Sequence, residues 1–172
     1  MVGPRVRGMT RSIGAAIIPL FVLGVACSES PQRSSASEAG AGIDSLNARI
    51  IQAYRERDPH TYAALYTDSA VFEWPDFNTV RGRAGLEAMA RSNWSSLNDL
   101  DLQLTVSSRR FAPNHATEFG AFQESWRDPR GVHMTEFGRY VVSLSRQPDN
   151  SWRIDRFFGF ADSTLPRSTR PQ

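Results

Sequence analysis

Glu136 has the residue type and the neighbours expected of a general acid or base. In the strand predicted over residues 132–145, alternation places Met134, Glu136 and Tyr140 on one face. A carboxylate among such side chains loses hydration, which raises its pKa and suits it to proton transfer. Alternatively, Glu136 lies at a solvated rim or pairs with an arginine, and then takes no part in a reaction. Glu136 is therefore the first catalytic candidate.

Asp76 is the second catalytic candidate. It follows Pro75 directly after the predicted strand 70–74, so it could supply a general base from a loop. The alternative is a turn residue, because Pro-Asp is common in turns. Trp74, before the proline, is expected to line a ligand pocket together with Met134.

Three tyrosines could donate a hydrogen bond to a ligand oxygen. These are Tyr54 and Tyr66 in the predicted helical region and Tyr140 in the predicted strand. The alternative is that they pack in the core, where aromatic residues at helical or strand spacing usually lie. We count all three as candidate ligand-binding residues.

Arg156 is expected to share a strand face with Trp152, Ile154 and Phe158. A guanidinium buried among apolar residues needs an acidic partner. That partner could be a side chain of this protein or a group of the ligand. Arg156 is therefore a further ligand-binding candidate.

Several kinds of chemistry lack their usual residues. All 20 basic residues are Arg, which excludes a Walker A loop and a Schiff-base lysine. The single cysteine, Cys27, excludes an internal disulfide and a multi-cysteine zinc site. His60, His115 and His133 have no metal-site spacing, and no serine-hydrolase elbow, glycine-rich nucleotide loop or HExxH motif occurs. We expect no cofactor and no metal.

Residues 1–26 have the features of an export signal. Three arginines precede an uncharged stretch from 12 to 28 that is interrupted by Pro19 and too short to span a bilayer. Removing this segment leaves 17 basic and 18 acidic residues, so the basic excess gives no reason to expect nucleic-acid binding.

Cys27 is a candidate lipidation site. Gly24, Val25 and Ala26 before it resemble the lipobox of bacterial lipoproteins, although Leu is usual where Gly24 stands. A lipid on Cys27 would anchor the protein in the bacterial cell envelope, facing the periplasm or the exterior. The alternative is a secreted protein with one free thiol. Residues 27–42, rich in Ser, Ala and Gly, are expected to form a flexible tether.

The remaining chain predicts one α+β domain over residues 43–162. Helices are expected at 44–57, after the Asp58-Pro59 cap, and at 82–93. Alternation with period two predicts strands at 99–106, 116–126, 132–145 and 151–159. In the second of these, Glu118, Phe122 and Glu124 share one face. Helices followed by an antiparallel meander favour helices packed on one face of a sheet, with a disordered tail at 163–172.

This order of elements resembles the nuclear transport factor 2-like superfamily, in its SnoaL-like and ketosteroid-isomerase-like branches. The resemblance covers essentially all of residues 43–162. The motifs that carry it are Arg57-Asp58, Leu65 to Val71, Val80 to Leu86, Glu118-Phe119-Gly120, Gly138 to Val142 and Trp152-Arg153-Ile154. It implies a curved sheet wrapped by three N-terminal helices into a cone with a pocket at its open end, commonly in a homodimer.

The superfamily includes isomerases, cyclases and dehydratases, so the fold alone does not give the function. The resemblance implies that the general base of a steroid isomerase would stand at Trp74 and its tyrosine donor at Ile51. The general base and the tyrosine of a steroid isomerase are therefore missing from these two positions, although Tyr54 lies one helical turn from Ile51. Glu136 corresponds to the third residue of the steroid-isomerase site, an inward-facing acid.

We expect an exported, lipid-anchored SnoaL-like domain that binds a small hydrophobic molecule and forms a homodimer. One alternative is a cofactor-free proton-transfer enzyme, an isomerase, cyclase or dehydratase, with Glu136 or Asp76 as base and Tyr54 or Tyr140 as donor. Another alternative is a dimerisation module whose cone is filled by side chains.

Overall fold

The computed structural model describes residues 3, 31–75 and 77–166. Cys27, Asp76, the end of the predicted tail and, except for residue 3, the predicted signal lie outside the described residues. The lipid on Cys27 and the role of Asp76 stay predictions. No helix in the described part of the chain is long and apolar enough to span a membrane.

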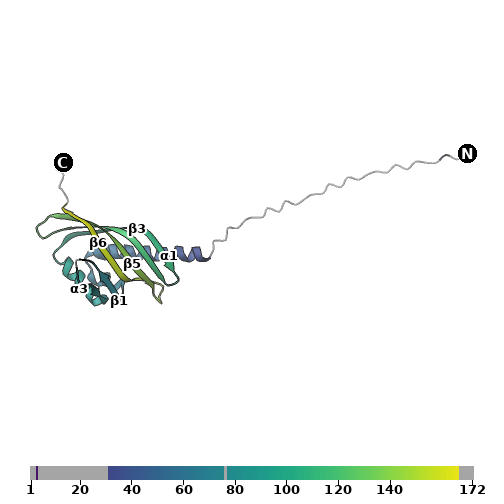
Figure 1. The fold of residues 1–172 in the computed structure, drawn as a ribbon, viewed down its shortest axis with the longest axis horizontal. Helices are drawn as coiled ribbons and strands as arrows, with labels where there is room; N and C mark the ends of the chain where they lie inside the picture. Colours follow the sequence, from purple (N-terminus) through teal and green to yellow (C-terminus); the bar gives the residue numbers. More distant parts are fainter. Residues whose placement is uncertain (1–2, 4–30, 76, 167–172) are drawn as a thin grey trace.

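Three helices pack against a six-stranded mixed sheet, so the predicted α+β class is confirmed (Figure 1). The sheet order is β2-β1-β6-β5-β4-β3; β1 and β6 run parallel and all other neighbours are antiparallel. In chain order the elements are α1 (Pro31–Glu56), α2 (Pro59–Ala64), β1 (Tyr66–Glu73), β2 (Val80–Arg81), α3 (Gly82–Trp94), β3 (Asn98–Ala112), β4 (His115–Arg127), β5 (His133–Arg146) and β6 (Trp152–Pro166).

The helices cover one face of the long strands and enclose the core. α1 packs against β3, and α3 packs against α2 and β1. Asp58 caps α2 as predicted, because its Oδ1 accepts a hydrogen bond from the Thr61 amide at 3.0 Å. Apolar residues of α1, such as Ile43 and Leu46, are buried against inward-facing residues of the strands, such as Leu144. This packing closes the narrow end of a cone.

α1 begins at Pro31, so the prediction that the helix starts near residue 44 after a flexible tether is wrong for residues 31–42. Arg146 pairs with Glu38 at 2.8 Å, and Gly42 lies against the ring of Trp152. The Ser, Ala and Gly composition indicated flexibility because these residues bury little surface of their own. Contacts with distant strands hold the segment in place instead.

β6 continues to Pro166, so the predicted disordered tail is wrong for residues 163–166. Thr164 pairs with Glu136 and Pro166 with Met134 in the ladder to β5. The polar composition of this segment gave no sign of a strand. In that strand, Thr164 faces the cavity. The extension matters because it brings Thr164 to the site.

Two bulges in β6 change which of its side chains face inward. Leu144 pairs with Ile154 while Ser143 pairs with Arg156, so Asp155 is an extra residue in the ladder. Ile154 and Phe157 therefore both face the cone, and Arg156 faces outward. The predicted burial of Arg156 is wrong: its side chain is 59% exposed and pairs with Glu73 at 3.5 Å.

The packing of α1 can be tested with two glycines. A Cβ at Gly40 would meet nothing closer than 3.9 Å, whereas a Cβ at Gly42 would lie 2.8 Å from the buried ring of Trp152. Gly40→Ala should raise the free energy of unfolding by up to about 1 kcal/mol, because alanine favours a helix. Gly42→Ala should lower it by about 1 kcal/mol or more, because the ring cannot move freely. Urea denaturation measures both, and equal effects of the two changes would contradict this packing.

Candidate active site

A cavity of about 750 Å³ opens between the helices and the inner face of the sheet. The cone is therefore not filled by side chains, contrary to the alternative of a filled-cone module. Glycines in the sheet help to leave this space, because aromatic rings lie flat against them. The Tyr140 ring lies over Gly120 and the Phe122 ring over Gly138, where an added Cβ would be 2.5 Å or less from the ring.

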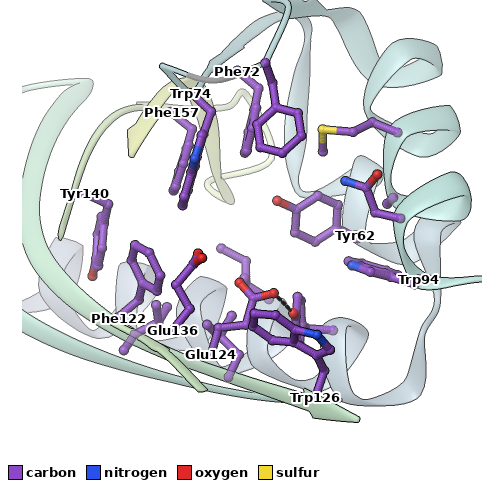
Figure 2. A pocket seen from close by; sticks show the side chains of 18 of the residues that line it. Tyr62, Phe72, Trp74, Trp94, Phe122, Glu124, Trp126, Glu136, Tyr140 and Phe157 are labelled. Carbon is purple, nitrogen blue, oxygen red and sulfur yellow. Dashed lines mark hydrogen bonds between the residues drawn. The ribbon is translucent and has the colours of Figure 1, made fainter. Parts of the chain in front are cut away.

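Most of the cavity wall is aromatic or aliphatic. Phe72, Trp74 and Phe157 stack nearly parallel, with interplanar angles of 6° or less. Figure 2 shows this group facing Tyr62 and Trp94 across the cavity. Such walls favour a flat or compact apolar ligand.

Two glutamates interrupt this apolar wall. Glu124 on β4 and Glu136 on β5 are direct partners in the antiparallel ladder, so their Cβ atoms lie about 5 Å apart. Both side chains line the cavity, and Figure 2 shows both projecting into it. Among the described residues that line the cavity, these two are the only charged side chains.

Each glutamate has one hydroxyl donor. The Tyr54 hydroxyl of α1 donates a short hydrogen bond to Glu124. Thr164 of β6 donates to Glu136 through its Oγ1 at 2.6 Å. Both carboxylates keep a second oxygen available to a ligand.

The surroundings shift the pKa values of Glu124 and Tyr54. Burial raises the pKa of Glu124 to about 7; the hydrogen bond from Tyr54 lowers it, and the charge of Glu136 raises it. Burial also raises the pKa of Tyr54 well above its usual value, and the charge of Glu124 adds to this rise. Tyr54 therefore stays protonated, and Glu124 can exchange a proton near neutral pH.

A third carboxylate, Glu118, is compensated in a different way. It is fully buried on β4 and pairs with Arg109 at 2.6 Å. Asn47 of α1 donates to both of its oxygens at 2.9 and 3.2 Å. The Tyr140 hydroxyl donates to it at 2.8 Å. Glu118 therefore holds Tyr140 in place and uses its hydroxyl proton.

The structure brings most of the predicted site residues to one cavity. Glu136, Tyr54, Tyr66, Trp74 and Tyr140 all line it. The Tyr66 hydroxyl bonds to that of Tyr62 at 2.7 Å, so its role is to order the cavity wall.

Two predicted ligand-binding residues lie elsewhere. Arg156 is on the outer face because of the bulge at Asp155. Met134 is the ladder partner of Trp126 and of Pro166, and it is not among the described residues that line the cavity. Alternation predicted the side of the sheet for Met134 but not how far the cavity extends along the strand.

Glu124 is a candidate catalytic residue that spacing within one strand did not single out. Alternation already placed it on one face with Glu118 and Phe122. The missing information was the register of β4 with β5, which sets Glu124 opposite Glu136, and the contact with Tyr54, 70 residues away in sequence.

The sequence matches one family model, and the fold matches solved structures. The family model for the SnoaL-like domain matches residues 35–157. A hexachlorocyclohexane dehydrochlorinase from Novosphingobium barchaimii has a TM-score of 0.71 at 14% identity, covering 81% of this chain and 97% of that one. A scytalone dehydratase-like protein from Novosphingobium aromaticivorans has a TM-score of 0.72 at 13% identity, covering 80% and 93%.

A ketosteroid isomerase-like protein from Erwinia carotovora has a TM-score of 0.64 at 18% identity, covering 72% of this chain and 95% of that one. No curated protein sequence matches this chain. At these identities the structural matches establish the fold, and the cavity residues must identify the chemistry.

The buried ion pair makes a testable contribution to stability. Arg109→Met leaves Glu118 buried without its countercharge, so it should lower the free energy of unfolding by about 3–5 kcal/mol. Arg55→Met removes a pair with Asp101 in which the Arg55 side chain is 52% exposed, and it should cost less than about 1 kcal/mol. Chemical denaturation followed by tryptophan fluorescence measures both. Similar small losses would show that Glu118 is not held by Arg109.

The pKa of Glu124 can be followed by carboxyl-carbon NMR. Glu124 should titrate near pH 7. Glu136→Gln should lower this pKa by removing a neighbouring negative charge, and Tyr54→Phe should raise it by removing a donor to the carboxylate. Titration of Glu124 near the ordinary glutamate pKa of 4.5 would contradict the description of the site.

The same shift predicts a pH dependence of stability. Between about pH 4.5 and 7 the folded state binds more protons at Glu124 than the unfolded state. The free energy of unfolding should therefore fall as pH rises through this range, and Glu124→Gln should remove this part of the dependence. Denaturation at several pH values compares the two proteins.

Proposed function

Since the chain belongs to the SnoaL-like domain family, we propose that it is a cofactor-free enzyme that moves a proton on a small hydrophobic substrate. The observation that carries this proposal is the Glu124–Glu136 pair inside the aromatic cavity. The proposed reaction class is elimination or isomerisation initiated by removing a proton from carbon.

The two carboxylates have complementary roles in this proposal. Burial and the neighbouring charge of Glu136 raise the pKa of Glu124, so Glu124 is the member of the pair that can carry a proton near neutral pH. Glu136 is the base that removes the carbon-bound proton. Glu124, whose pKa is raised to about 7, is the acid that donates a proton to a leaving group or a developing oxyanion.

Other cavity residues support the pair. The Tyr54 hydroxyl holds the Glu124 carboxyl in one orientation, and Thr164 does the same for Glu136. The stacked group of Phe72, Trp74 and Phe157 offers a flat apolar surface to the substrate. A substrate seated there would exclude water from the carboxylates and preserve the raised pKa of Glu124.

The names of two structural neighbours are consistent with an elimination. A dehydrochlorinase removes hydrogen chloride, and a dehydratase removes water. Both reactions take a proton from the substrate together with a leaving group. At 14% and 13% identity, the names support the reaction class alone, and the cavity residues of this chain carry the proposal.

The proposal can be tested with nitrobenzisoxazole, a neutral aromatic probe. When a base removes its ring C–H proton, the N–O bond breaks and a coloured nitrile-bearing nitrophenolate forms. The protein should accelerate this reaction above the rate in buffer, and Glu136→Gln or Glu124→Gln should each lower the acceleration by at least about tenfold.

Glu56→Gln is the matched control. Glu56 is exposed at the end of α1 and receives a hydrogen bond only from the exposed Gln52, so this variant should keep the full rate. Circular dichroism checks that all three variants are folded. No acceleration by the wild-type protein, or equal loss in all three variants, would overturn the proposed function.

A further inference from the structure

We infer that the cavity is built for an organic cation, a small apolar molecule that carries a protonated amine or another positive group. This inference rests on the proposed function and specifies its substrate class. Its basis is the balance of charge and hydrogen-bonding groups around Glu124 and Glu136.

The charge in the cavity has no countercharge from the described part of the protein. No Arg, Lys or His is among the described residues that line it. With a proton on Glu124, the Glu124–Glu136 pair still carries one negative charge. A negative charge held in an apolar cavity without a partner is costly, and a cationic ligand would remove that cost.

The hydroxyl groups next to the carboxylates are already engaged by carboxylates of the protein. The hydroxyl protons of Tyr54, Thr164 and Tyr140 are already donated to Glu124, Glu136 and Glu118, respectively. Tyr62 and Tyr66 bond to each other. An anionic ligand such as a carboxylate or phosphate would meet the negative charge of the pair with no basic side chain in the described lining to offset it, whereas an ammonium group could donate to the ionised carboxylate.

Aromatic rings stand on both sides of the pair. Figure 2 shows Trp74, Phe122 and Phe157 on one side of Glu136, and Trp94 and Trp126 on the side of Glu124. The face of an aromatic ring attracts a cation, most strongly when water is excluded. Negative charge, aromatic walls and the absence of basic side chains all favour the same class of ligand.

The cone itself provides an internal comparison. Glu118, a few residues away on the same face of β4, is neutralised by Arg109. The Glu124–Glu136 pair receives only hydroxyl donors. The protein thus compensates a structural carboxylate with its own cation and leaves the cavity pair for a cation from outside.

The inference can be tested with three probes that share one naphthyl body: naphthylmethylamine, naphthylmethanol and naphthoate. Isothermal titration calorimetry at about pH 7, where the amine is protonated and the acid ionised, gives the three dissociation constants. The amine should bind at least about tenfold more tightly than the alcohol, and naphthoate should bind most weakly.

Two variants show whether the carboxylates cause the preference. Glu136→Gln and Glu124→Gln should each reduce the preference for the amine over the alcohol, while alcohol binding changes little. Glu56→Gln, on the exposed end of α1, should leave all three constants unchanged. Thermal unfolding of each variant identifies any loss of fold.

The outcomes separate this inference from the proposed function. Equal binding of amine and alcohol, tighter binding of naphthoate, or binding of none of the three would overturn the cation inference. The nitrobenzisoxazole assay uses a neutral probe, so acceleration there would leave the proton-transfer function standing. A preference for the amine that survives both glutamine variants would also overturn the inference, because the cavity pair would not be its cause.

Discussion

The uninterrupted pairing of β4 with β5 is the constraint on which the site depends. The ladder runs in constant register from the pair His115–Ser145 to the pair Arg127–His133. Because side chains alternate with period two, a slip of one residue would turn Glu136 and Tyr140 to the outer face. This register places Glu124 opposite Glu136. The carboxylate pair is thus a property of strand pairing rather than of a local motif.

β6 and the helices adapt to that ladder. The bulges at Asp155 and Asp162 let Ile154, Phe157 and Thr164 all face inward, although they are spaced by three and seven residues. α1 then brings Tyr54 onto the end of Glu124. The cavity stays open because the rings of Tyr140 and Phe122 lie against Gly120 and Gly138 instead of projecting into the space.

Periodicity and capping signals predicted much of this arrangement. The helix at 82–93, the Asp58 cap and the inward face of Glu136 and Tyr140 follow from spacing within one element. The outward turn of Arg156 and the strand beyond residue 162 did not follow, because bulges and edge pairing depend on a neighbouring strand. The partnership of Tyr54 with Glu124 was inaccessible for the same reason, since it joins elements far apart in sequence.

The carboxylates inside the cone differ in how fully their negative charge is compensated, and this difference matches their roles. Glu118 has a guanidinium, an amide and a tyrosine hydroxyl, which together satisfy a buried negative charge. Glu124 and Glu136 have one hydroxyl each and face open space. A structural role would favour full compensation, because partial compensation of buried charge lowers stability. Incomplete compensation is useful where a proton or a ligand supplies the missing partner, and the cavity pair meets that condition.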